Sequence, residues 1–97
     1  MVKHIVMFKL KGSDEERRNL ALKFKAAIDA LPEKIDVLRA VETGVNGNPS
    51  EQFDVVLTAT VDTMADVAVY AKHPDHVAAA GLLAGHVDIR ACVDYEL

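Results

Sequence analysis

The chemically most suggestive stretch is Y-A-K-H-P-D-H, residues 70–76, which places a tyrosine and two histidines around one proline. Histidine titrates near neutral pH and can accept a proton, and a tyrosine hydroxyl can donate a hydrogen bond to a carbonyl oxygen or an enolate. Tyr70 and His76 could therefore abstract a proton next to a carbonyl group without a cofactor. In this hypothesis His76 is the base and Tyr70 is the hydrogen-bond donor.

The same stretch has two other interpretations. A histidine before a proline often satisfies a helix end, and Tyr70 could be a core aromatic residue with its hydroxyl at the rim. The segment H-P-D-H, with His4 as a third ligand, could also bind a metal. Histidines three residues apart across a proline lack the spacing of a regular helical zinc site, so we predict no metal.

These residues must be positioned by a helix that breaks. Thr63 and Asp66 form a capping box at the start of a predicted helix that carries Tyr70. The residue before a proline avoids the helical region, so His73 should interrupt this helix. Pro74 can then begin a second helical segment, which places His76 near its N-terminal end and continues toward Gly85.

Residues 2–11, VKHIVMFKLK, predict a strand with two alternating faces. His4 is the one polar residue on the face that also carries Val2, Val6, Phe8 and Leu10, so this face should point toward the helices. Ser13 and Glu16 form a second capping box, and the helix that follows runs to about Leu31 and stops at Pro32.

Three further strands are predicted at residues 35–45, 53–62 and 87–97, with a turn at N-G-N-P-S between the first two of them. The order is strand, helix, strand, strand, broken helix, strand. This order is typical of the ferredoxin-like α+β class, βαββαβ, with a four-stranded antiparallel sheet and its helices on one face.

The other face of the predicted sheet is too apolar to remain in water. We assign to it Ile5, Met7, Leu38, Ala40, Val56 and Cys92. Packing this face on the same face of a second copy would bury it, so we predict a homodimer in which two sheets close into a dimeric α+β barrel.

The composition fits one domain that spans residues 1–97, with 51% hydrophobic and 27% charged residues. Eleven Lys and Arg residues are scattered among fifteen Asp and Glu residues, and the net charge of −4 argues against nucleic acid or an anionic membrane as partner. The sequence contains one cysteine and neither a signal peptide nor a nucleotide-binding glycine motif. We therefore predict a cytoplasmic protein without a cofactor.

Three segments resemble the stress-responsive A/B barrel (Dabb) family: M-V-K-H-I-V-M-F-K-L-K at the start, Y-A-K-H-P-D-H-V in the centre and V-D-Y-E-L at the end. The resemblance covers nearly the whole chain and implies dimeric α+β barrels built from ferredoxin-like protomers. One plant member, olivetolic acid cyclase, is a cofactor-free polyketide cyclase whose catalytic Tyr and His occupy positions similar to those of Tyr70 and His76.

The resemblance implies a pocket between sheet and helices, for which we expect the lining residues His4, Val6, Phe8, Phe24 and His73. The predicted function is binding of a small apolar carbonyl compound, with cofactor-independent cyclase- or lyase-like acid/base chemistry. The alternatives are a non-catalytic stress-responsive or ligand-binding protein and a cofactor-free monooxygenase-like degradative enzyme. With only 5% aromatic residues, a flat polyketide would be held less tightly here than in the plant cyclase.

Overall fold

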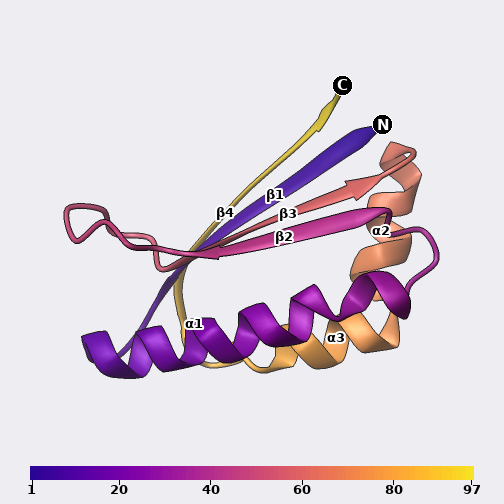
Figure 1. The fold of residues 1–97 in the computed structure, drawn as a ribbon. Coiled ribbons are helices and arrows are strands. Elements are labelled where there is room, and N and C mark those ends of the chain that lie inside the picture. Colours follow the sequence, from indigo (N-terminus) through magenta and orange to yellow (C-terminus); the bar gives the residue numbers. More distant parts are fainter.

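The computed structural model describes residues 1–97 and confirms the ferredoxin-like βαββαβ fold. In chain order the elements are β1 (Val2–Leu10), α1 (Asp14–Asp29), the 3-10 turn η1 (Leu31–Glu33), β2 (Ala40–Val45), β3 (Val55–Val61), α2 (Met64–Lys72), α3 (Pro74–Gly81) and β4 (Val87–Glu96). The strands form one antiparallel sheet in the order β2-β3-β1-β4. All helices lie on one side of this sheet, and the other side is open (Figure 1).

Both predicted capping boxes are present and start helices α1 and α2. The side chains of Ser13 and Thr63 accept hydrogen bonds from the backbone N–H groups of Glu16 and Asp66, and the two carboxylates bond back to the cap backbone. The predicted break is also present, because His73 has an extended backbone (φ −61°, ψ 136°) between α2 and α3. Gly85 has φ +80°, a left-handed conformation that glycine adopts without strain, and leads the chain from α3 into β4.

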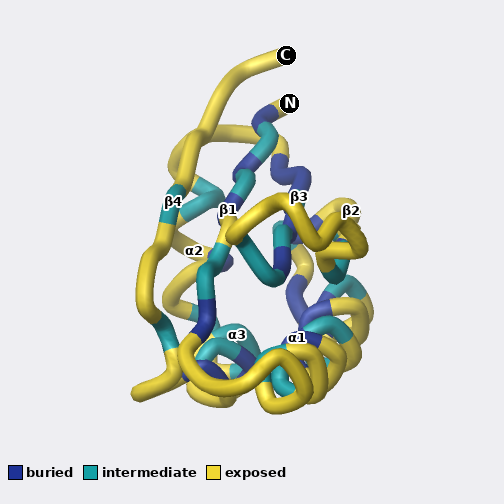
Figure 2. Tube along the Cα trace, turned by 90° about the vertical axis from the view of Figure 1, so that its left-hand side faces the viewer, coloured by how far each residue is buried: buried dark blue, intermediate teal, exposed yellow.

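The hydrophobic core fills the space between the sheet and the helices. The side chains of Val2, Val6 and Leu57 enter it from the central strands β1 and β3, and those of Phe24 and Ile28 enter it from α1. Figure 2 shows buried residues along β1 and β3, whereas the edge strand β4 is exposed over most of its length. The core therefore depends on the two central strands.

The predicted strand at residues 35–45 was too long at its beginning. Only Ala40–Val45 pair with β3, because the 3-10 turn η1 is followed by an irregular segment before the strand starts. Ile35 and Leu38 lie in this segment and are buried in the core, so the assignment of Leu38 to the uncovered face was wrong. Their apolar side chains fill the core from a loop.

The assignment of Cys92 to the uncovered face was also wrong. In the register between β1 and β4, Cys92 lies opposite Val6 and Asp94 lies opposite His4, so both share the face that points toward the helices. The apolar residues of β4 point toward the uncovered face, since Ala91 and Val93 lie opposite Met7 and Ile5. The apolar residues of the uncovered face are therefore Ile5, Met7, Ala40, Val56, Ile89, Ala91, Val93 and Tyr95.

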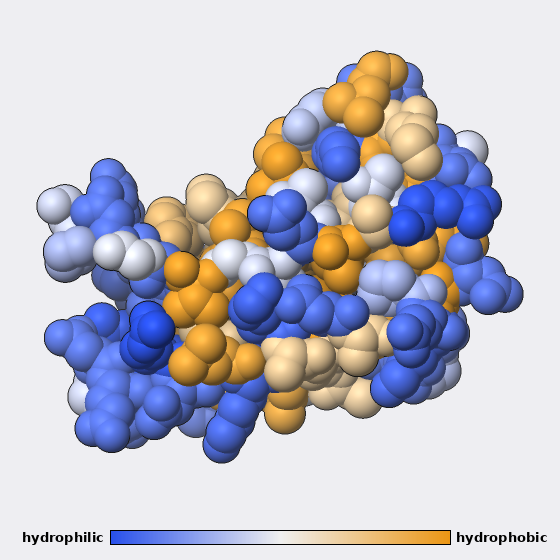
Figure 3. Space-filling model, viewed as in Figure 1, coloured by the Kyte–Doolittle hydropathy of each residue, from blue (hydrophilic) through white to orange (hydrophobic).

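Several of these side chains leave a large area exposed, such as Val93 at 54% and Tyr95 at 42%. Figure 3 shows hydrophobic surface over the strands, while the loop after β2 and the beginning of α1 are hydrophilic.

None of the helices combines the length and the hydrophobicity that crossing a lipid bilayer would require.

Candidate functional site

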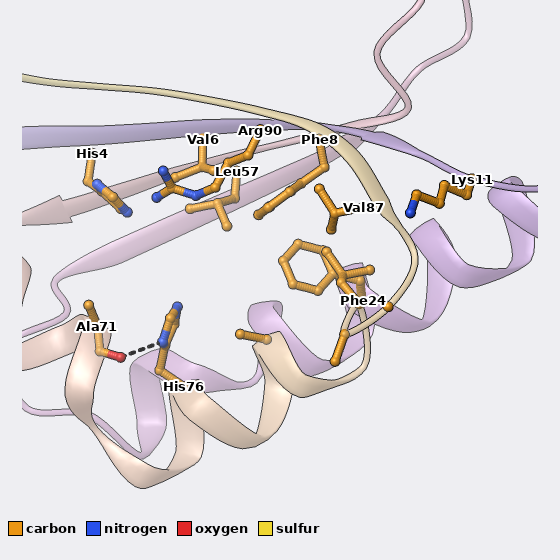
Figure 4. Close-up of a pocket in the computed structure, with 14 residues that line it drawn as sticks. His4, Val6, Phe8, Lys11, Phe24, Leu57, Ala71, His76, Val87 and Arg90 are labelled. Atoms are coloured by element: carbon orange, nitrogen blue, oxygen red, sulfur yellow. Dashed lines mark hydrogen bonds between the residues drawn. The ribbon is translucent and has the colours of Figure 1, made fainter.

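A cavity of about 440 Å³ lies between the sheet and helices α1 and α3. Nine of its fourteen lining residues are hydrophobic, so the cavity suits a mainly apolar ligand. The lining residues are His4, Val6, Phe8, Lys11, Phe24, Leu57, Ala71, His76, Ala80, Leu83, Ala84, Gly85, Val87 and Arg90. Figure 4 shows His4, Val6 and Phe8 directed from β1 toward the helices, and His76 directed from α3 toward the sheet.

Four of the five residues predicted to line the pocket do so, namely His4, Val6, Phe8 and Phe24. Phe8 and Phe24 meet edge to face across the cavity wall, with ring centroids 5.6 Å apart. His73 does not line the cavity, which corrects the prediction for this residue. Its Nδ1 accepts a hydrogen bond of 3.1 Å from the backbone N–H of Asp75, so its side chain caps helix α3.

The Nε2 atom of His76 is a free hydrogen-bond acceptor, because no other group of the protein bonds to it. Its Nδ1 lies 2.8 Å from the carbonyl oxygen of Ala71 (Figure 4), and because a carbonyl only accepts, Nδ1 must carry the proton. The neutral ring then has its lone pair at Nε2. Burial lowers the pKa of His76 below its ordinary value of 6.5, against the opposing effect of the Ala71 carbonyl. At neutral pH the side chain is therefore a neutral base.

Tyr70 lies directly against this histidine and is completely buried. Its ring centroid is 4.5 Å from that of His76 and 5.9 Å from that of His4. The hydroxyl has no hydrogen-bond partner, and burial raises the pKa of Tyr70 to about 12. Tyr70 is not among the lining residues of the cavity; its hydroxyl keeps its proton and is a hydrogen-bond donor without an acceptor.

Two residues beside His4 escaped the sequence-based site prediction. His4 is buried, with 7% of its surface exposed, and its Nδ1 makes a direct hydrogen bond with Oδ1 of Asp94. The Sγ atom of Cys92 is 3.7 Å from the same Nδ1. Only the register of β4 on β1 brings the three together, and no sequence spacing signals it.

Cys92 lacks the properties of an activated nucleophile. Partial burial raises the pKa of its thiol, and the neighbouring carboxylate of Asp94 acts in the same direction. The thiol form therefore dominates near neutral pH.

The lining of the cavity also contains Lys11 and Arg90, two cations that the sequence did not predict at the pocket.

The comparisons with known proteins find relatives of the same fold. A dimeric protein of unknown function and ferredoxin-like fold from Bacteroides fragilis NCTC 9343 is 49% identical with a TM-score of 0.95, over 99% of this chain and 95% of that one. A dimeric ferredoxin-like protein of unknown function from Jannaschia sp. CCS1 is 24% identical, with a TM-score of 0.80 over 99% and 98% of the two chains. Hydroxynitrile lyase from Passiflora edulis is 16% identical, with a TM-score of 0.73 over 97% and 90%.

The last two similarities establish the fold alone. A search of curated proteins finds no match, and none of the three structures is described as a cyclase, so the cyclase-like role of Tyr70 and His76 stays a prediction. The model of the Stress Responsive A/B Barrel Domain (Dabb) matches residues 2–97, which is nearly the entire chain. The protein belongs to the stress responsive A/B barrel domain family.

Proposed function

We propose that this protein is a homodimer that binds a small, mainly apolar carbonyl compound in the cavity and catalyses proton transfer at the carbon next to the carbonyl group. The observation that carries the proposal is the pairing of two complementary groups. His76 is a neutral base with a free Nε2 on the cavity wall, and the adjacent Tyr70 has a protonated hydroxyl without a partner.

In the proposed step, Nε2 of His76 takes the proton from the α-carbon of the ligand. The electrons of the broken C–H bond form the carbon–carbon double bond of an enolate, and the negative charge moves to the ligand oxygen. The hydroxyl of Tyr70 donates a hydrogen bond to this oxygen, in surroundings where burial strengthens such a bond. The enolate can then take the proton back from His76, or it can attack a second carbonyl group of the ligand and form a carbon–carbon bond. In the second case the new alkoxide takes the proton from His76, which is the cyclase-like outcome, and the reverse cleavage is the lyase-like one.

The step can be tested without knowing the physiological ligand. We expect the protein to exchange the α-hydrogens of some members of a panel of short aliphatic and aromatic ketones for deuterium in D₂O, as followed by NMR. His76→Ala should abolish this exchange because it removes the base, and Tyr70→Phe should slow it because the enolate loses its donor. Exchange that continues unchanged in His76→Ala would contradict the assigned roles.

One observation favours a second candidate, a ligand-binding protein without catalysis. The hydrogen bond from Nδ1 of His76 to Ala71 joins α3 back to α2 across the break, so His76 also has a structural use. If the pair serves only this purpose, His76→Ala should lower the melting temperature, and the wild-type protein should bind ketones without exchanging their hydrogens. The monooxygenase alternative stays a prediction from the fold alone.

The proposed homodimer is supported by the uncovered sheet face and by relatives that are described as dimeric. Contiguous apolar surface of this kind usually marks an interface. Two such faces packed together would bury Ile5, Met7, Ile89, Val93 and Tyr95 from each chain, and the cavities would remain on the opposite sides of the two sheets, under the helices.

A further inference from the structure

Three side chains with different metal-binding atoms meet where β1 pairs with β4. Nδ1 of His4 makes a direct hydrogen bond with Oδ1 of Asp94, and Sγ of Cys92 lies 3.7 Å from this nitrogen and 3.8 Å from the carboxylate oxygen. All three ligand atoms lie within 4.8 Å of one another. Neither Cys92 nor Asp94 takes part in the proton transfer proposed for Tyr70 and His76.

We propose that His4, Cys92 and Asp94 form a binding site for a divalent transition-metal ion of the zinc class. Imidazole nitrogen, thiolate sulfur and carboxylate oxygen are the three ligand types that zinc takes in proteins. Tetrahedral coordination at bond lengths of about 2.0–2.3 Å separates neighbouring ligand atoms by roughly 3.3–3.6 Å. The two distances to sulfur are already close to this range, and the side chains of His4 and Asp94 would turn apart so that each binds the metal in place of their hydrogen bond.

The strand pairing fixes this arrangement without a loop. His4 and Asp94 are directly opposite each other in the antiparallel register, and Cys92 lies two residues before Asp94 on the same face. The backbone therefore holds the three Cβ atoms in place before a metal arrives, and only side-chain rotations are needed. Such a preformed set avoids most of the ordering cost of binding.

The site is accessible and incomplete, as a metal site with an open position would be. Cys92 and Asp94 are exposed on the edge strand, so an ion can enter from solvent, while the buried His4 anchors the inner side. Three protein ligands leave a fourth tetrahedral position for water or a ligand atom. His4 also lines the cavity, so the metal would lie at the cavity wall.

This proposal is independent of the proposed proton transfer, and its test does not use activity. Co²⁺ is added to the untagged, reduced full-length protein, and the absorption spectrum is recorded. We expect saturation at one cobalt per chain, an intense thiolate-to-cobalt charge-transfer band in the near ultraviolet, and loss of this band when Zn²⁺ is added. Cys92→Ser should remove the charge-transfer band, and Asp94→Asn should weaken cobalt binding at least about tenfold.

Asp88→Asn is the matched control, because Asp88 lies on the same strand but pairs with Lys9, and it should leave the titration unchanged. Both test residues are exposed, and circular dichroism in the presence of a chelator checks that the variants fold. The proposal is overturned if the wild-type protein shows no charge-transfer band at stoichiometric cobalt. It is equally overturned if Cys92→Ser keeps the band, or if Asp94→Asn binds cobalt as tightly as the wild type.

Discussion

Replacing Tyr70 with phenylalanine should stabilise the protein. Tyr70 is completely buried and its hydroxyl has no hydrogen-bond partner, so folding removes this group from water without compensation. An unsatisfied buried polar group costs about 1–3 kcal/mol, whereas the aromatic contacts with His4 and His76 would be kept by phenylalanine. For a domain of this size, each kcal/mol shifts the melting temperature by about 4–8 °C. We therefore expect Tyr70→Phe to melt at least about 4 °C higher than the wild type.

The assay is thermal unfolding followed by circular dichroism, with both proteins at the same concentration because dimerisation would make the melting temperature concentration-dependent. Ser50→Ala is the control, since it removes a hydroxyl from an exposed loop residue that lies outside the proposed interface, and it should change the stability by less than about 0.5 kcal/mol. A lower melting temperature for Tyr70→Phe would refute the reasoning, because it would mean that the hydroxyl makes a stabilising bond. A more stable but less active variant would indicate that the hydroxyl is retained for function.

Three further predictions concern pH, packing and assembly. The pKa of His76 is lower in the folded than in the unfolded protein, so its contribution to stability is present above pH 6.5 and is lost as the pH falls below that value. In thermal melts, the melting temperature of His76→Gln should therefore fall less in acid than that of the wild type. Phe24→Ala should lower the free energy of unfolding in urea by about 3–5 kcal/mol, since the ring is buried. Leu22→Ala on the exposed side of α1 should lower it far less, and equal losses would contradict the assignment of Phe24 to the core. Val93→Lys should raise the dimer dissociation constant at least about tenfold in analytical ultracentrifugation, while the equally exposed Val69→Lys on α2 should not; a fully dimeric Val93→Lys would argue against the proposed interface.

The fold could be predicted because local signals and periodicity agree along most of the chain. The two capping boxes and the His73–Pro74 break are short-range features, so their position in the sequence fixes their position in the structure. The segment before β2 could not be predicted in the same way. Ile35 and Leu38 are apolar and lie close to a strand, but they are buried from a loop, and apolar character alone does not distinguish the two cases.

The sequence could predict those residues of the candidate site whose position depends on a single helix or strand. His4, Val6 and Phe8 share one face of a single strand, so alternation was sufficient to place them at the cavity. Cys92 and Asp94 depend on the register between two strands about 90 residues apart in sequence, and β4 has alternating faces that can be assigned in either phase. Strands β1 and β4 are not joined by a turn, so no short-range feature of the sequence fixes their register.

The break between α2 and α3 has a consequence for how the Tyr-His motif should be recognised in other sequences. On an uninterrupted α-helix, positions six residues apart differ by about 600°, which leaves their side chains roughly 120° apart around the axis. Tyr70 and His76 could not touch on such a helix, yet their ring centroids are 4.5 Å apart. The His-Pro pair between them thus creates the contact, so a related chain that keeps the tyrosine and the second histidine but has lost the proline should not be credited with the same pair of functional groups.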